Sequence, residues 1–289
     1  SSVSSLKISN CTFSDNIATG DFLGGGGIFM SSSGSDTITN CTFIRNYATG
    51  YYSSGGAINT NNYALAIKNS IFWGNKKRGF FVSNIEGQGS AIVSYSDVEG
   101  GFSGINNINQ DPLFVNQNDL DGADNIFGTA DDGLALQNCS PAMNVGNNAD
   151  IPLGISTDIT GAARIHNITV DMGAYENQAG VMSVSIAVTP SDTVCAGTSV
   201  TFTATPIHVG LAPIYTFKVN GTSIQNGTSA TFTTTNLANG DKVVVVLTSG
   251  ACVVASDTIT MIVNPLPIPT AGSNSPICAG DSLKLTSSG

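Results

Sequence analysis

An acidic segment with the sequence NDLDGADNIFGTADDG contains the residues best suited to bind a metal ion. Its five carboxylates belong to Asp119, Asp121, Asp124, Asp131 and Asp132. The D-x-D-G-x-D spacing at its start lets alternate oxygens converge on one cation, and its glycines permit sharp turns. Calcium is the expected ion, because it is hard and takes six to eight oxygen ligands. The segment departs from an EF-hand, since its twelfth position is Ala130 instead of a bidentate Glu, and a solvated acidic loop without metal is the alternative.

Two short elements are similar to those of polygalacturonases, a family of parallel β-helix enzymes. Asp131-Asp132 matches their paired carboxylates, and Arg164-Ile165-His166 matches an R-I-K element. The Asn-Thr-Asp and Gly-His-Gly elements of that family are missing, and the aspartate pair lies in a Gly-rich segment. Acid and base carboxylates need rigid elements that hold them at a defined separation. With His166 and His208 as the only histidines, neither beside a plausible nucleophile, we expect no catalytic residues in this chain.

The charge distribution narrows the classes of partner. The chain of 289 residues has a net charge of −10, and its acidic excess lies in residues 110–180, with 10 acidic against 1 basic residue. No basic footprint for nucleic acid is present, and no apolar run is long enough for a membrane helix. The one basic run, Lys76-Lys77-Arg78, either binds an acidic sugar, serves a lyase or is a solvated loop.

A repeat of about thirty residues determines how these groups are positioned. ISNCTFSDNIATG (residues 8–20) returns as ITNCTFIRNYATG (38–50) with nine identities, and IKNSIFWGN (67–75) is a third copy. Such a period is typical of stacked coils, here of a parallel β-solenoid whose equivalent residues lie directly above one another. We expect Phe13, Phe43 and Phe72 to stack inside. We also expect two series to pass amide hydrogen bonds along the axis: Asn10, Asn40 and Asn69, and Asn16, Asn46 and Asn75.

The cysteines fall into two groups. Cys11 and Cys41 occupy one site of the repeat, where Ser70 follows them, and are either buried thiols or an inter-coil disulfide.

From residue 181 onward, apolar residues alternate with polar ones, as in an antiparallel sandwich. TVCAG at Cys195 returns as PICAG at Cys278, 83 residues later, which is the size of one Ig-like domain. Cys252 is the only other cysteine there, so we expect a Cys195–Cys252 disulfide and an oxidising compartment.

Three segments resemble known families. The F-x-x-N and G-G-x-I pairing, as at Phe13–Asn16 and Gly25–Ile28, resembles the repeats of chlamydial-type polymorphic outer membrane proteins, which implies a surface β-helical adhesin. DPLF (111–114), CSPAMNVG (139–146) and DITGAARIHNITVDMGAYE (158–176) together resemble the choice-of-anchor Q module of secreted bacterial right-handed β-helix proteins, which closes the solenoid. Residues 181–289 resemble the Ig-like or PKD-like repeats of cell-surface proteins from Bacteroidetes-type bacteria.

We therefore predict an all-β chain, in which a right-handed parallel β-helix (1–109) is closed by an acidic cap (110–180). An Ig-like sandwich (181–265) and the start of a second, truncated copy (266–289) come next. Both ends look like cuts within a longer protein. The predicted function is that of an extracellular, cell-surface structural or adhesive element, with calcium as a bound ion and a glycan or surface protein as partner. The alternative is the non-catalytic or C-terminal part of a polysaccharide-acting β-helix enzyme.

Overall fold

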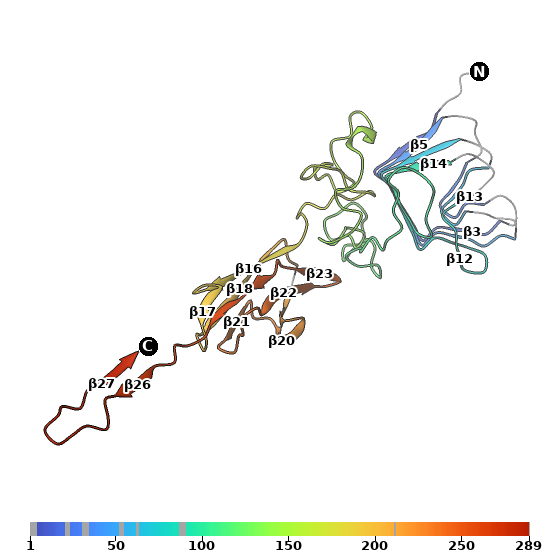
Figure 1. The fold of residues 1–289 in the computed structure, drawn as a ribbon. Coiled ribbons are helices and arrows are strands. Elements are labelled where there is room, and N and C mark those ends of the chain that lie inside the picture. The colour runs from blue at the N-terminus through green and yellow to red at the C-terminus, as the bar shows by residue number, and fades with distance from the viewer. Residues whose placement is uncertain are drawn as a thin grey trace. The chain divides into compact units, whose positions relative to one another are not determined.

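The structure is a computed structural model that describes residues 5–20, 24–30, 35–51, 55–61, 64–86, 91–210 and 212–288. It divides into two compact units, Ser1–Met182 and Ser183–Gly289, which are described one at a time (Figure 1). The described ranges consist of strands, turns and one short 3₁₀ helix, η1 (Asn148–Asp150). None of their helices has the length and apolar character needed to cross a bilayer. The predicted all-β class is confirmed.

The first unit is built on four stacks of short strands, as the repeat predicts, with one strand per coil except in sheet 3, where β11 and β12 come from the same coil (Figure 1). Sheet 1 contains β1 (Lys7–Ser9), β5 (Asp36–Thr39), β9 (Leu65–Lys68) and β14 (Ala91–Ser94). Sheet 2 contains β2 (Thr12–Ser14), β6 (Thr42–Ile44), β10 (Ile71–Trp73) and β15 (Asp97–Val98). Sheet 3 contains β3 (Ile17–Ala18), β7 (Tyr47–Ala48), β11 (Lys76–Lys77) and β12 (Phe81–Val82). Sheet 4 contains β4 (Ile28–Phe29), β8 (Ile58–Asn59) and β13 (Ile85–Glu86). All pairs are parallel except β11–β12, so the first unit is a parallel β-helix.

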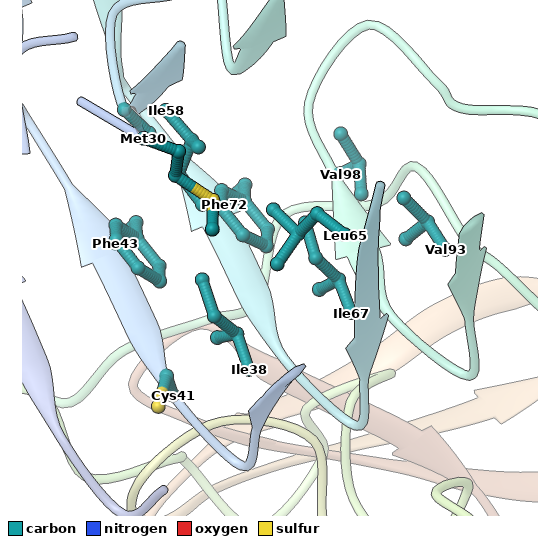
Figure 2. Packing of buried hydrophobic residues seen from close by; sticks show 11 residues of the cluster. Met30, Ile38, Cys41, Phe43, Ile58, Leu65, Ile67, Phe72, Val93 and Val98 are labelled. Atoms are coloured by element: carbon teal, nitrogen blue, oxygen red, sulfur yellow. The ribbon is translucent and has the colours of Figure 1, made fainter. Parts of the chain in front are cut away.

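The core of the stack is a set of like side chains in register. Phe13, Phe43 and Phe72 are paired across sheet 2, with ring centroids 4.5 and 4.7 Å apart and nearly parallel planes. On sheet 1, Ile38 and Ile67 are paired in the same way and face the phenylalanines (Figure 2). The spacing of the rings matches the strand spacing of a sheet, so each coil adds one layer to a continuous apolar interior.

A second series satisfies the polar groups at the corner between sheets 1 and 2. The side chains of Cys11, Cys41, Ser70 and Ser96 each donate a hydrogen bond to the carbonyl oxygen two residues before them. Cys11 and Cys41 are free thiols, so the thiol alternative is the one the structure contains. The hydrogen bond with Cys41 lowers the pKa of Cys11 to about 6, and burial raises that of Cys41.

The Asn16 series forms a ladder along the axis. Asn16 Nδ2 donates to Asn46 Oδ1 at 2.8 Å, and Asn46 Nδ2 donates to Asn75 Oδ1 at 2.9 Å. The ladder continues from Asn75 Nδ2 to Asn84 Oδ1 at 3.0 Å. Each acceptor oxygen of Asn46 and Asn75 also takes the backbone N–H of the preceding asparagine in the ladder. Buried amides are costly unless they are hydrogen-bonded, and here they satisfy one another.

Residues 102–110 add a partial fifth rung at the C-terminal end of the stack. Ile108 forms a parallel bridge with Asp97, and Asn107 Nδ2 donates to the carbonyl oxygen of Val93 at 3.0 Å. Phe102 packs against the apolar interior. This rung buries Asp97, and the burial raises the pKa of its carboxyl to about 7.

Residues 110–180, here called the flank module, pack against the side of the stack. Ile44, Ile71 and Trp73 point outward from sheet 2 and join a cluster with apolar residues of the module, among them Phe114, Leu134 and Met172. Gly173 lies against this face: a Cβ there would lie 2.9 Å from Thr42 Oγ1 and 2.8 Å from Ile71 Cδ1. We expected this module to close the end of the solenoid. The end is covered by residues 102–110 instead, because the outer face of sheet 2 is apolar and must itself be buried.

The second unit consists of antiparallel sheets around a separate core. One sheet contains β16 (Ser183–Thr189), β18 (Val200–Ile207) and β21 (Thr231–Thr234). The other contains β20 (Thr222–Gly227), β19 (Ile214–Val219), β22 (Lys242–Ser249), β23 (Cys252–Ala255) and β24 (Ile259–Thr260). Phe202 and Phe232 of the first sheet meet Phe217 of the second, with the rings of Phe217 and Phe232 5.7 Å apart. The antiparallel sheets predicted from the alternating pattern are confirmed.

The expected Cys195–Cys252 disulfide is not formed. Cys195 is an exposed free thiol at the end of β17 (Thr193–Cys195), which pairs in parallel with β25 (Ile262–Asn264). Cys252 is buried at the start of β23, opposite Ser249 in a different sheet. Cys139 and Cys252 are the disulfide-bonded cysteines, and Cys278 is a free thiol. The positions of Cys195 and Cys252 in sequence suggested a pairing, but Cys195 is exposed whereas Cys252 is buried, so the two cysteines lie in different surroundings.

The last segment forms a hairpin of β26 (Thr270–Ser273) and β27 (Leu285–Ser288). Every residue from 266 to 287 is exposed. The hairpin therefore contributes no buried residue to the core of the second unit.

The Asn16 ladder predicts a graded loss of stability. Asn46→Ala removes four hydrogen bonds from a buried position, whereas Asn16→Ala removes one at the exposed end. Since each buried group left without a partner costs about 1–3 kcal/mol, we expect Asn46→Ala to lower the free energy of unfolding by about 3 kcal/mol or more, and Asn16→Ala by about 1. Urea unfolding of both variants checks this. Equal losses would show that the ladder does not stabilise the stack.

Candidate functional site

The structure brings three of the five predicted metal ligands together. One carboxylate oxygen each of Asp124, Asp131 and Asp132 lies within 4.8 Å of the others. Asp119 and Asp121 do not belong to this group. The D-x-D-G-x-D spacing thus does not produce the expected convergence. The three that meet come from both ends of the loop, because the chain folds back on itself at Gly122 and Gly128, both with positive φ.

The loop is held by hydrogen bonds to its own carboxylates. Asp131 Oδ2 accepts from the backbone N–H of Ala123 at 2.8 Å, and Asp131 Oδ1 accepts from Thr129 Oγ1 at 2.7 Å. The bond from Thr129 is the main reason why the pKa of Asp131 lies below its usual value. Gly122 is required here, since a Cβ would lie 2.7 Å from Asp131 Oδ2. Asp131 therefore stays ionised and faces solvent.

Asp132 anchors the loop to the interior of the flank module. Its carboxylate is fully buried and accepts hydrogen bonds from the N–H of Gly128 at 2.7 Å and from Tyr175 Oη at 2.6 Å. Burial and the bond to Asp132 raise the pKa of Tyr175 above its ordinary value, so Tyr175 remains a donor. The Asp131–Asp132 pair thus has one exposed and one buried member, although one oxygen of each lies within 4.8 Å of the other.

Arg164 lies at the centre of a buried charged cluster that consists of Asp158, Arg164, Asp171 and Glu176. Arg164 is 1% exposed and donates from Nη2 to Glu176 Oε2 at 3.0 Å and from Nη1 to the carbonyl oxygen of Ala174 at 2.9 Å. Burial lowers the pKa of its guanidinium, and the surrounding carboxylates oppose that effect. The similarity of Arg164-Ile165-His166 to a polygalacturonase element therefore does not extend to its role, because a polymer cannot reach this arginine.

The three carboxylates of the charged cluster hold the backbone of the module in place. Asp158 Oδ2 accepts from the N–H of Glu176 at 2.9 Å, Glu176 Oε1 from that of His166 at 3.0 Å, and Asp171 Oδ1 from that of Asn144 at 2.7 Å. Burial raises the pKa of Asp171 to about 6. The sequence predicted a module from the series Asp158 to Glu176 but not this cluster. The signal was a lone Arg among three acidic residues within one short segment.

The Asn10 series was expected to form a ladder and instead holds the flank module. Asn10, Asn40 and Asn69 lie at corners with φ of 53, 52 and 49°, so their side chains point away from the stack. Their Nδ2 groups donate to carbonyl oxygens of the module, at Thr157, Asp171 and Asn147 respectively. Asn69 Oδ1 also accepts from the N–H of Asn147 at 2.8 Å. Asparagine tolerates the left-handed conformation, which places its amide where the module needs partners.

Sheet 3 presents side chains to solvent. Along its outer side, Ile17, Tyr47 and Lys76 are paired in register, and Phe80 stacks on Tyr47 with ring centroids 5.5 Å apart. Phe80 is 72% exposed. These residues line a groove of about 350 Å³, together with Asp15, Arg45, Asn46 and Gly74.

The basic run begins in β11 of this sheet, and its three members have different surroundings. Lys77 forms an ion pair with Glu86 at 2.7 Å, and Arg78 lies over the ring of Tyr51 at 4.7 Å. Lys76 is exposed and pairs with no described carboxylate. The arrangement offers rings and cations at a surface, which suits binding of a ligand.

Comparison with known families agrees with this architecture. Residues 1–120 match the family model described as "Right handed beta helix region". The match covers the four coils, the partial fifth rung and the start of the flank module, and gives the handedness of the solenoid. A comparison with curated proteins finds no match to the chain.

The charged cluster predicts a large effect of one substitution. Arg164→Met leaves buried carboxylates without their cation, and breaking such a pair costs about 3–5 kcal/mol. Lys77→Met is the matched control, because Lys77 pairs with Glu86 at a partly exposed position within the solenoid and exposed pairs contribute about 0.2–1 kcal/mol. We expect chemical unfolding of the first unit to separate the two variants accordingly. Similar losses would mean that the buried cluster does not hold the module.

Proposed function

We propose that this chain is an extracellular, surface-displayed structural and adhesive element, in which the solenoid presents a binding face and the sandwich unit acts as a spacer. The observation that carries this proposal is the contrast between two sides of the stack. The outer side of sheet 2 is covered by the flank module, whereas the side of sheet 3 exposes aromatic and basic side chains. Exposed apolar groups gathered at one surface are typical of interaction sites.

The rigidity of the stack supports a presenting role. Continuous ring stacking and the Asn16 ladder tie each coil to the next, so residues on the outer side keep fixed spacings along the axis. A preorganised surface binds a partner without the cost of ordering itself. The same stack would suit a passive scaffold, but a scaffold does not need exposed rings.

The surroundings of the residues considered for catalysis favour binding over chemistry. Arg164 and Asp132 are buried and hydrogen-bonded within the flank module, and Asp131 belongs to a Gly-rich loop. A glycosidase needs two carboxyl groups placed across the scissile bond. These residues therefore support a structural role in the flank module.

The location outside the cell is supported by cysteine chemistry. Cys139 and Cys252 are disulfide-bonded, and disulfides are typical of exported proteins.

We also propose that calcium binds to the group of Asp124, Asp131 and Asp132. Their three oxygens, two of them at exposed residues, form an anionic surface of the kind that a hard cation prefers. A bound ion would offset the repulsion among these carboxylates and tie the two ends of the loop together.

Calcium is therefore expected to raise the melting temperature of the full chain. At a calcium concentration a hundred times Kd, the gain is about 2.7 kcal/mol, or roughly 5–10 °C for a unit of this size. Asp131→Asn should lose the shift and Asp119→Asn, the control outside the group, should keep it. If the melting temperature does not change across a calcium titration, the segment is an acidic loop that binds no calcium.

The adhesive function is tested by presenting the full chain to a glycan array and to uronic-acid polymers, with and without EDTA, while both retention and product release are measured. We expect retention of a ligand without release of shortened chains. Release of cleavage products would favour the enzyme alternative. If the chain retains no glycan and attaches to no host or microbial cell surface, the remaining function is that of a spacer.

A further inference from the structure

Two ring pairs, Tyr47–Phe80 and Tyr51–Arg78, lie beside sheet 3, and together with Lys76 they are here called the aromatic–basic face. Two ring contacts organise it. Phe80 stacks on Tyr47 with an interplanar angle of 11°, and the guanidinium of Arg78 lies over Tyr51. Phe80 and Tyr51 are nonetheless 72% and 66% exposed, so most of their ring surface faces solvent. The rings are positioned by neighbours but not buried by them.

The backbone at Phe80 indicates that this exposure is not incidental. Phe80 has a φ of 63°, in the left-handed region, and closes a turn in which its N–H donates to the carbonyl oxygen of Lys77 at 2.9 Å. Gly or Asn adopts that conformation readily, whereas a bulky aromatic residue there is strained. A large apolar residue that is both strained and exposed destabilises the fold. Contact with a partner outside the chain would explain why such a residue is present.

The charge of this side is opposite to that of the whole chain. Three basic residues lie at this face, namely Arg45, Lys76 and Arg78. Two described acidic residues accompany them: Asp15, which pairs with Arg45, and Glu99, which accepts a hydrogen bond from the N–H of Gly74 in the groove. Among the described residues, three positive and two negative charges give +1 at this face, against −10 for the chain. A local excess of positive charge attracts an anionic ligand.

The groove between the rings and the charges has the size of a small-ligand site. Its volume of about 350 Å³ lies between Phe80 and Tyr47 on one side and the Asp15–Arg45 pair on the other. Lys76 lines it without a described carboxylate partner. Binding sites of this volume combine apolar walls with a few fixed polar groups, as this groove does.

We propose that the aromatic–basic face binds an anionic glycan. A sugar ring stacks its C–H face on Phe80, because C–H groups meet the negative face of an aromatic ring favourably. The carboxylate or sulfate of the glycan pairs with Lys76, and its hydroxyls bond with the Asp15–Arg45 pair. This inference rests on the proposed adhesive function and names its partner.

A glycan fits this face better than an acidic peptide does. Extended peptides gain affinity by adding a strand to an open sheet edge, through backbone hydrogen bonds. The groove lies on the face of sheet 3, where β7 is paired on both sides with β3 and β11. It therefore offers side chains rather than unpaired backbone groups. A polysaccharide needs only ring faces and charged or hydroxyl-bonding side chains.

The test uses the full chain and isothermal titration with three polymers: polygalacturonate (carboxylated), heparin (sulfated) and dextran (neutral). Two variants address the face, Lys76→Gln and Phe80→Asn. Asparagine accepts the backbone conformation of position 80, so Phe80→Asn should unfold at the same or a higher temperature than the wild type. Lys7→Gln is the matched control, since Lys7 is an exposed lysine of β1 on sheet 1.

We expect at least one of the two anionic polymers to bind and dextran not to bind. Each face variant should weaken that binding by about tenfold, which is the size expected for losing one charge-assisted or ring contact, and Lys7→Gln should leave it unchanged. Raising the salt concentration should weaken wild-type binding more than that of Lys76→Gln.

Two outcomes overturn the inference while the adhesive function stands. In one, an anionic polymer binds equally well to the wild type and to both face variants, so the site lies elsewhere. In the other, no glycan binds but the chain attaches to an acidic protein or to cells, so the partner class is wrong. Cleavage of a polymer, by contrast, contradicts the proposed function itself.

Discussion

The stacking of like side chains in register along one axis is the constraint on which the rest of this structure depends. Once Phe13, Phe43 and Phe72 lie above one another, every other position of the repeat is placed on a fixed side of the coil. Residues beside the phenylalanines in the same strands must then point outward. Ile44 and Ile71, which are both apolar, therefore lie on the outer side of sheet 2. If they were exposed to solvent, they would form an apolar patch on that side.

The flank module buries the apolar outer side of sheet 2 and has an unusual interior of its own. Its described residues form few regular elements, and buried carboxylates accept part of its backbone N–H groups, as Asp158 and Glu176 show. Buried carboxylates need a cation, and Arg164 provides it in the interior. The module thus combines an apolar contact with sheet 2 and a charged core of its own, while Asn10, Asn40 and Asn69 join the two through side-chain hydrogen bonds. The acidic composition of this region is in part structural.

Periodicity in the sequence was enough to predict the local features of the fold. The coils, the inward phenylalanines and the alternation of the second unit are all local patterns, and the structure contains them. Contacts that do not follow the repeat were not predicted. Asp119 and Asp121 have the spacing of ion ligands, yet the loop brings Asp124 to Asp131 and Asp132. Cys195 and Cys252 share a unit, yet Cys195 is an exposed free thiol and Cys252 is buried. In each case the sequence pattern predicted which chemistry the side chain could carry out. Which residue it contacts depends on how the chain folds.

The two asparagine series show why position within the coil matters more than residue type. Asn46 comes directly after a left-handed corner and enters the stack, where its partners are the neighbouring asparagines and the carbonyl oxygen of Phe13, so it forms a ladder. Asn40 is itself at a corner, with its side chain directed out of the stack, so it is free to hold whatever packs alongside. The same reasoning separates the sides of the solenoid. A side whose corners are engaged by a module is closed to partners, and a side that retains an exposed, strained aromatic residue such as Phe80 is where a partner gains most by binding.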